Sequence, residues 1–225
     1  MKNIILFLTV LACTLSFSQQ QKSSFLIKKK TTEITGDISL WNNNDESENE
    51  FGTYDSQSFN LSFSPNYGYA IKDNLVIGVG AGYSHSFSKS KDYDDDYSER
   101  NYYNNEYSVF PYIKKYFPIG KKVAFSLRGE LRYSHNHYKH EYSNSNSLND
   151  STNKSNEYFI GLRPGISLFV TKKILLKANL GSVGYSNIDG KNNIGEEEES
   201  EYTSKRFNFS LNSTQFTAGL TFLLN

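Results

Sequence analysis

Apolar and polar residues alternate along much of the chain with a period of two, which is the pattern of β-strands and not of helices. The segment 58–71 shows this alternation most clearly. Its apolar set comprises Phe59, Leu61, Phe63, Tyr67, Tyr69 and Ile71. The intervening set is polar or small and comprises Ser58, Asn60, Ser62, Ser64, Asn66, Gly68 and Ala70. The segment is therefore predicted to be a strand with one apolar face.

The same alternation recurs in six further segments, 75–87, 107–113, 123–133, 158–170, 174–180 and 207–224, and more weakly in 34–40. Short turns near residues 72–74, 118–120 and 171–173 alternate with long polar connections. Short connections on one side and long ones on the other are typical of a closed membrane barrel. We predict an all-β, antiparallel transmembrane β-barrel of about eight strands, with short periplasmic turns and four long extracellular loops.

The strand register is open in three places. The apolar positions of the last strand change from odd (Phe207 and Phe209) to even (Phe216 onward), which a bulge near 212–215 would reconcile. Tyr185 is out of phase in the seventh strand, and the first strand has a weak pattern. Pro65, Pro111 and Pro164 recur at a spacing of about 50 residues, and each predicts a local bulge because proline cannot donate to the sheet.

The N-terminus has the features of a cleaved signal peptide. Lys2 precedes an apolar run from Ile4 to Leu15, and small residues follow at Ser16 and Ser18. The run is shorter than the roughly 20 residues of a membrane helix. We expect a signal peptide at 1–18, a periplasmic N-terminal tail at 19–30 and the barrel at 31–225. Cleavage after Ser18 would remove Cys13, the only cysteine, and a lipid anchor on Cys13 is the less favoured alternative.

Charge and composition narrow the class further. Basic and acidic residues balance at 24 each, so no nucleic-acid partner is expected. Aromatic residues reach 15% while hydrophobic residues reach only 37%, which suits an aromatic outer surface and a polar interior. Acidic residues gather in the long connections, as in 45–55, 92–99 and 196–201, whereas lysines mark the turn ends. This separation indicates two different aqueous faces.

With these features the chain resembles the outer-membrane β-barrel domain family, in particular small OmpA/OmpX-like barrels. The resemblance rests on the signal peptide, the paired strands across 67–75 and the amphipathic last strand. It implies an outer-membrane location, contact with membrane lipid and lipopolysaccharide, and insertion by the barrel-assembly machinery, but no single activity. The chain departs from the pattern at its end, where Leu223, Leu224 and Asn225 follow Phe222. A soluble periplasmic barrel of lipocalin type, with its faces inverted, is the alternative.

Six charged residues fall on the predicted inward face: Lys114, Arg128, Glu130, Arg132, Arg163 and Lys177. Eight strands leave an interior that side chains fill. The favoured interpretation is a polar network of structural ion pairs in which Glu130 bridges neighbouring arginines. The alternative is a narrow anion-preferring pore, because five cations face one carboxylate in this set.

Other residues carry weaker hypotheses. His135, His137 and His140 are weak metal candidates, and no metal or cofactor is expected. Ser84, His85 and Ser86, or Ser134 with His135, have the residue types of a lipid-modifying enzyme, but their order alone defines no triad. Gly78, Gly80 and Gly82 are expected to make room inside the barrel. We predict a non-enzymatic protein with a structural or surface-interaction role, with a possible extracellular partner that binds the loops.

Overall fold

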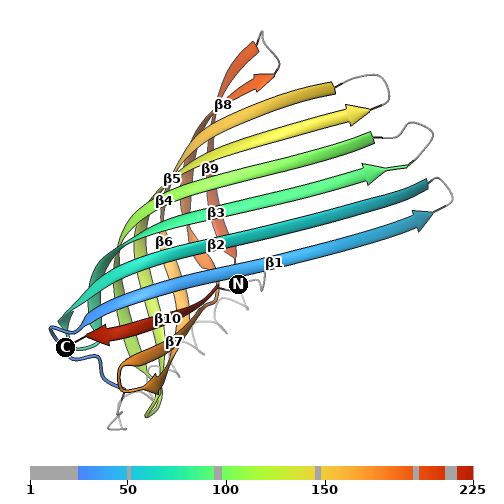
Figure 1. Ribbon diagram of the computed structural model, residues 1–225. Coiled ribbons are helices and arrows are strands. Elements are labelled where there is room, and N and C mark those ends of the chain that lie inside the picture. The colour runs from blue at the N-terminus through green and yellow to red at the C-terminus, as the bar shows by residue number, and fades with distance from the viewer. Residues whose placement is uncertain are drawn as a thin grey trace, which may run out of the picture.

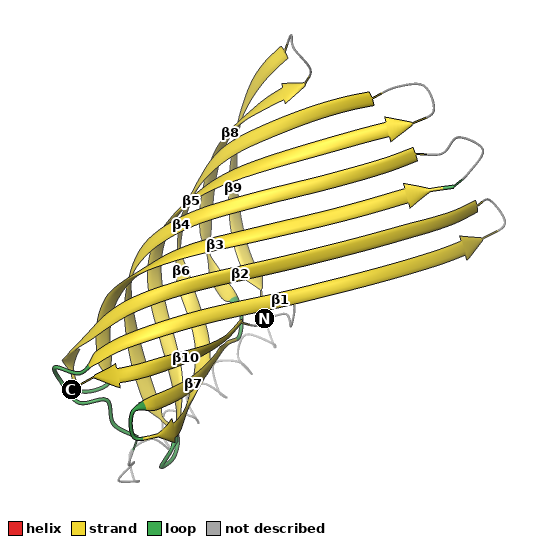
Figure 2. Ribbon diagram, in the orientation of Figure 1, coloured by secondary structure: helices red, strands yellow, loops and turns green. Residues whose placement is uncertain are grey.

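The computed structural model describes residues 25–49, 52–93, 98–144, 148–194, 198–210 and 217–224, and the predicted signal peptide lies outside these residues. The described residues form strands and short connections (Figure 2). Among them, no helix is long and apolar enough to cross a membrane. The strands are β1 (Thr32–Asn49), β2 (Gly52–Lys72), β3 (Leu75–Asp92), β4 (Ser98–Pro118), β5 (Val123–Asn144), β6 (Leu148–Thr171), β7 (Ile174–Asn179), β8 (Ser182–Ile194), β9 (Glu198–Ser210) and β10 (Thr217–Leu224).

The strands close into a ring of eight. Strands β1 to β6 pair antiparallel in chain order, β6 pairs with β7, β7 with β10, and β10 returns to β1 (Figure 1). Residues Thr32–Ile38 of β1 pair with Leu224–Ala218 of β10, which closes the ring at the turn end. The predicted antiparallel barrel of about eight strands is confirmed.

The seventh strand of the ring is interrupted. The seventh consists of β7 and β8, which pair with the lower and upper parts of β6. The register with β6 shifts by one residue between them, at Leu180–Ser182, where Gly181 has a φ of 107°. This shift explains why Tyr185 is out of phase with the apolar residues of β7. The bulge predicted at 212–215, between β9 and β10, lies outside the described residues.

Strand pairing continues through the segments that were expected to be long loops. The β1–β2 hairpin stays in register up to Asn49 and Gly52, and the other three hairpins extend in the same way. Asp45, Glu46 and Asp55 thus lie on strands and not in irregular loops. Four polar hairpins protrude from one end of the ring (Figure 1). We call them the outer hairpins.

The prolines differ from one another. Pro65 and Pro111 keep a single register with their neighbours on both sides, so the bulges predicted there are wrong. Each instead interrupts the pairing on one side only, where a missing N–H is tolerated. Pro164 lies opposite the β7–β8 bulge, and its carbonyl accepts a hydrogen bond from the Leu180 N–H.

Burial is inverted relative to a soluble protein. Large apolar side chains, among them Ile34, Phe63, Val109, Ile160 and Phe222, are exposed on the outer surface of the ring. The alternate positions face inward and are mostly polar, and many are fully buried. The two-residue period of a strand places these two sets on opposite faces.

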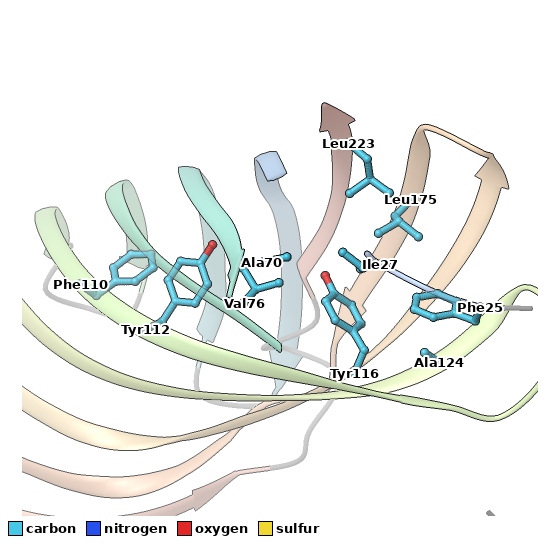
Figure 3. Packing of buried hydrophobic residues seen from close by; sticks show 10 residues of the cluster. All are labelled: Phe25, Ile27, Ala70, Val76, Phe110, Tyr112, Tyr116, Ala124, Leu175 and Leu223. Atoms are coloured by element: carbon cyan, nitrogen blue, oxygen red, sulfur yellow. The ribbon is translucent and has the colours of Figure 1, made fainter. Parts of the chain in front are cut away.

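The base of the barrel, at its turn end, is filled by an apolar cluster to which the N-terminal tail contributes. Phe25 and Ile27 are each 1% exposed and pack with Tyr116, Leu175 and Leu223 inside the ring (Figure 3). The centre of the Phe25 ring lies 4.6 Å from the centre of the Phe169 ring and 5.7 Å from the centre of the Tyr116 ring. Residues from 25 onward, expected as part of a periplasmic tail up to 30, therefore plug the base.

Asn74 holds this plug in place from the β2–β3 turn. Its side-chain oxygen accepts from the Ile27 N–H at 2.8 Å, and its own N–H donates to the Ile27 carbonyl at 2.8 Å. The Asn74 carbonyl also accepts from the Tyr116 N–H. Asn74 has a φ of 59°, a left-handed conformation that asparagine tolerates better than most residues.

Candidate functional site

The six charged residues predicted to face inward all lie inside the ring. Their centre is Glu130 on β5, whose carboxylate contacts three arginines. Arg132 Nε donates to it at 3.0 Å and Arg163 Nε at 2.7 Å, while Arg128 Nη2 lies 3.0 Å away. The Glu130 side chain has no exposed surface. We call these four residues the Glu130 cluster.

The arginines of the Glu130 cluster are held by neighbouring strands. Arg128 and Arg132 lie on β5, two residues before and two residues after Glu130, so alternation places all three on the same face. Arg163 stands directly opposite Arg128 on β6. The Arg132 guanidinium lies 3.9 Å from the centre of the Phe110 ring and donates to Ser108 Oγ. The planar groups are thus oriented by both stacking and hydrogen bonds.

Two further ion pairs lie below and beside this cluster, and both involve carboxylates that sequence analysis did not single out. Lys114 Nζ lies 2.5 Å from Glu33 Oε2, and Tyr116 donates to the other Glu33 oxygen at 2.9 Å. Lys177 Nζ lies 2.9 Å from Asp37 Oδ2. The interior therefore holds further carboxylates besides Glu130 to oppose the five predicted cations.

The alternation of residues in the first strand could have identified Glu33 and Asp37 as facing inward. Ile34 and Ile38 are exposed on the outer surface, so the residues before them must face inward. Glu33 is fully buried and Asp37 is 5% exposed. Such buried charges require partners because an unpaired charge inside a protein costs several kcal/mol or more.

Glycines on β3 let the β4 side chains lie across the interior. A Cβ on Gly80 would clash with the Phe110 ring, and one on Gly78 would contact the Tyr112 hydroxyl at 2.5 Å. A Cβ on Gly82 would lie 2.5 Å from Ser108 Oγ. The three glycines therefore make the room that was expected of them, and the space is taken largely by aromatic rings.

A cavity of about 410 Å³ lies in the interior on the hairpin side of the Glu130 cluster. Arg128, Arg132 and Arg163 line it on one side, together with Phe110. Asp37 and Glu106 also line it, and Glu106 accepts a hydrogen bond from Ser134 at 3.0 Å. The remaining walls are largely serine, asparagine and threonine. The cavity is thus polar, and its charged groups come from β1, β4, β5 and β6.

The histidines do not form a common site. His135 Nδ1 lies 2.9 Å from Asn156 Oδ1, and His85 Nδ1 lies 2.9 Å from Asn105 Oδ1. His140, on the other face of β5, stacks on Tyr102 with the ring centres 4.3 Å apart. His137 shares the face of His135 by alternation. Across the described residues, no three histidine, cysteine or acidic side chains come together as a metal-ligand set.

The outer hairpins carry ion pairs that are more exposed to solvent than those of the interior. Lys89 pairs with Glu99 at 2.7 Å across β3 and β4, and Lys191 pairs with Glu201 at 2.9 Å across β8 and β9. Lys139 donates a hydrogen bond to Glu141, which raises the pKa of the Lys139 ammonium. These pairs are in contact with solvent, so each contributes little to stability.

No protein-family model matches this sequence, and no curated protein matches it. The chain is similar in structure to a major outer membrane protein from Thermus thermophilus, with a TM-score of 0.42, 11% identity, and coverage of 86% of this chain and 99% of that one. It is also similar to Neisserial surface protein A, with a TM-score of 0.35, 16% identity, and coverage of 85% and 96%. A third similar structure is the N-terminal β-barrel domain of Pseudomonas aeruginosa OprF, with a TM-score of 0.28, 12% identity, and coverage of 88% and 100%. The closed ring of this chain is defined by its own strand pairing.

Proposed function

We propose that this chain is an integral outer-membrane β-barrel that acts as a scaffold, with its plugged base in the periplasm and its four outer hairpins presented to the surroundings. The observation that carries the proposal is the inverted burial of the ring. Apolar side chains cover the outer surface, while charged and hydroxyl groups are buried inside. Such a surface is stable against lipid hydrocarbon and unstable against water.

The height of the apolar surface matches a bilayer. On β6 the outward apolar residues run from Tyr158 to Val170. Twelve steps of about 3.3 Å at a tilt of about 40° project to roughly 30 Å, the thickness of a hydrocarbon core. Aromatic residues mark both edges: Tyr83 pairs with Tyr107 and Tyr133 with Tyr158 at the hairpin side, and Phe117 with Phe125 at the base. Aromatic girdles of this kind lie at membrane interfaces.

The filled interior supports a scaffold over a pore. The apolar plug buries Phe25, Ile27 and Tyr116 at the base, and the Glu130 cluster occupies the middle. The surface left for recognition is that of the outer hairpins, which expose charged and tyrosine side chains such as Tyr54 and Tyr102. We propose that membrane lipid and lipopolysaccharide contact the apolar surface, that the barrel-assembly machinery inserts the chain, and that any extracellular partner binds the outer hairpins.

Membrane insertion is tested by fractionation and heat-modifiability. The expected result is a protein in the outer-membrane fraction that migrates differently on a gel before and after boiling. Orientation is tested with Asp45→Cys on the β1–β2 hairpin and Lys172→Cys in the β6–β7 turn, each as the single cysteine of the mature chain. A membrane-impermeant maleimide is expected to label the first variant in intact cells and the second only after permeabilisation. A soluble periplasmic protein, or the reverse labelling, would overturn the proposal.

Conduction separates the scaffold from the pore. Planar-bilayer recordings of the folded, heat-modifiable protein are expected to show no steps above the bilayer background. Small anion-selective steps would instead support the narrow pore, because the described interior holds five of the predicted cations against the carboxylates Glu33, Asp37, Glu106 and Glu130.

A further inference from the structure

A Tyr-Ser-His sequence occurs twice in the chain, on β3 and on β5, and its first copy forms a hydrogen-bonded set on the outer surface of the ring. Tyr83 and His85 lie two residues apart, so alternation places both on the same face of β3. Asn105 lies directly opposite His85 on β4. Its Oδ1 accepts from the Tyr83 hydroxyl at 3.1 Å and lies 2.9 Å from His85 Nδ1. We call such a set of three side chains a Tyr-His-Asn triad.

The second triad repeats this geometry on the next hairpin. Asn156 lies opposite His135 on β6, and its Oδ1 accepts from the Tyr133 hydroxyl at 2.8 Å and lies 2.9 Å from His135 Nδ1. A carboxamide oxygen only accepts, so the histidine Nδ1 carries the hydrogen in both triads. Two donors thus fix the orientation of the asparagine amide. The histidine Nε2 and the asparagine Nδ2 are left for a further partner.

The second triad lies just beyond the edge of the apolar surface. In the membrane position proposed above, Tyr158 marks that edge on β6, and Asn156 and Lys154 follow on the same face toward the tip of the hairpin. Two steps of about 3.3 Å at a tilt of about 40° project to about 5 Å. Asn156 and Lys154 therefore lie about 5 Å and about 10 Å outside the hydrocarbon core, at the depth of lipid headgroups and just above it. The lysine side chain is long enough to extend back to the headgroups.

Strand pairing places basic side chains in one row at this depth. His137 lies opposite Asn105 on one side and opposite Lys154 on the other, and Lys154 lies opposite Lys191 on β8. Lys191 is paired with Glu201 at 2.9 Å, whereas Lys154 is exposed and has no ion-pair partner within the described strands. Like charges directly opposite each other in a sheet are destabilising. An anion bound at Lys154 would relieve this repulsion.

The groups that face outward around Lys154 can donate to one anion. They are the Lys154 ammonium, Asn156 Nδ2 and, when protonated, the imidazole of His137. The neighbouring carboxylate of Asp189, opposite Asn156 on β8, already accepts from the Thr203 hydroxyl at 2.9 Å. Phosphate oxygens accept short, charge-assisted hydrogen bonds from ammonium and imidazolium groups. The donor set therefore fits a phosphate better than a cation or a neutral group.

We propose that His137, Lys154 and Asn156 bind the headgroup phosphate of a lipid in the outer leaflet, and we call them the phosphate site. The acyl chains of this lipid lie on the apolar surface below the site, beside the exposed side chains of Tyr158 and Ile160. The triad acts as a positioning element, because it orients the Asn156 amide. The proposal rests on the membrane insertion proposed above and names the chemical group through which the lipid is recognised.

The chain has four histidines, so their imidazole signals in a nuclear magnetic resonance spectrum report on the phosphate site. Protein with isotope-labelled histidine is folded in neutral dodecyl maltoside micelles, its heat shift is verified, and it is titrated with dodecyl phosphate at constant pH. Saturable shifts of the His135 and His137 signals are expected. His140, on the inner face of β5 and stacked on Tyr102, is the internal control and is expected to stay unchanged. No saturable shift, or equal shifts of all four signals, would overturn the proposal.

Variants locate the phosphate. Lys154→Gln is expected to raise the dissociation constant for dodecyl phosphate about tenfold, because it removes a charge-assisted hydrogen bond. Lys154→Arg, which keeps the charge, is expected to retain most of the affinity. The matched control is Lys139→Gln on the same face of β5 as His137, since the Lys139 ammonium is already paired with Glu141 and Asp150. Wild-type affinity in Lys154→Gln, or an equal loss in Lys139→Gln, would overturn the assignment.

Two further titrations separate a membrane lipid from a free anion or a non-specific amphiphile. Inorganic phosphate is expected to leave the His137 signal unchanged at the concentrations at which dodecyl phosphate saturates it, because it has no chain for the apolar surface. Equal saturation by inorganic phosphate would assign the site to a soluble anion and overturn the lipid. Dodecyltrimethylammonium, which has the same chain and a cationic head, is expected to give no saturable shift, and such a shift would overturn the phosphate. Failure of the heat shift, by contrast, would reject membrane insertion before any lipid is added, so the two failures are distinguishable.

Discussion

The lower and upper halves of this barrel share strands β1 to β6 but are stabilised in different ways. In the lower half the ring is closed through β1 and β10, and the Glu130 carboxylate is buried among three arginines. In the upper half β1 and β9 are not paired in the described residues, and ion pairs such as Lys191–Glu201 have side chains that are 57% and 73% exposed. The difference indicates that an ion pair contributes substantially to the stability of this fold only where the ring excludes water.

Removal of one carboxylate from each half should give the largest contrast. Glu130→Gln leaves three arginines without their shared anion, and we expect a loss of about 3–5 kcal/mol in the free energy of unfolding. Glu201→Gln removes the exposed partner of Lys191, and we expect a loss of about 0–1 kcal/mol. Urea titration of the folded barrel, followed by the heat shift on a gel, measures both. Equal losses would show that the interior is as wet as the hairpins.

The plug gives the next largest effect. Phe25→Ala empties space between the rings of Tyr116 and Phe169, and we expect a loss of about 3 kcal/mol, as for other buried phenylalanines. Leu26→Ala is the matched control because Leu26 adjoins Phe25 in sequence but is 41% exposed. Its effect should stay within about 0.5 kcal/mol. If both variants have the same urea midpoint of unfolding as the wild type, the N-terminal tail does not stabilise the lower half.

Glycine substitutions sharpen the comparison further. Gly80→Ala places a methyl group against the Phe110 ring, and we expect a cost of about 1–3 kcal/mol from overpacking. Gly120→Ala, at a turn where an added Cβ meets nothing within 4 Å, should be nearly neutral. The double variant Gly80→Ala/Phe110→Leu should recover part of the loss. The same unfolding titration measures all three, and no recovery would mean that the strain lies in the backbone.

The two halves also differ in how far the sequence predicts them. The period of two placed Arg128, Glu130 and Arg163 on one inward face, because alternation depends only on local strand geometry. It did not predict which residues of β1 pair with β10, since pairing between strands far apart in sequence depends on register and bulges. Phe25 and Ile27 stand next to a run of lysines, so their sequence neighbourhood resembles a polar tail. The turn at Asn74, through its hydrogen bonds to Ile27, helps to place them inside the base.

Shortening an outer hairpin should have the smallest effect on the stability of the barrel. It tests the comparison by a change in the upper half. Asp45 and Ser56 are register partners on β1 and β2, so residues 46–55 can be replaced by Asn-Gly without a change in register. We expect the free energy of unfolding to change by less than about 0.5 kcal/mol, because surface groups away from the core contribute little. The temperature at which the heat shift is lost measures this. A loss comparable to that of Glu130→Gln would mean that the outer hairpins hold the ring together.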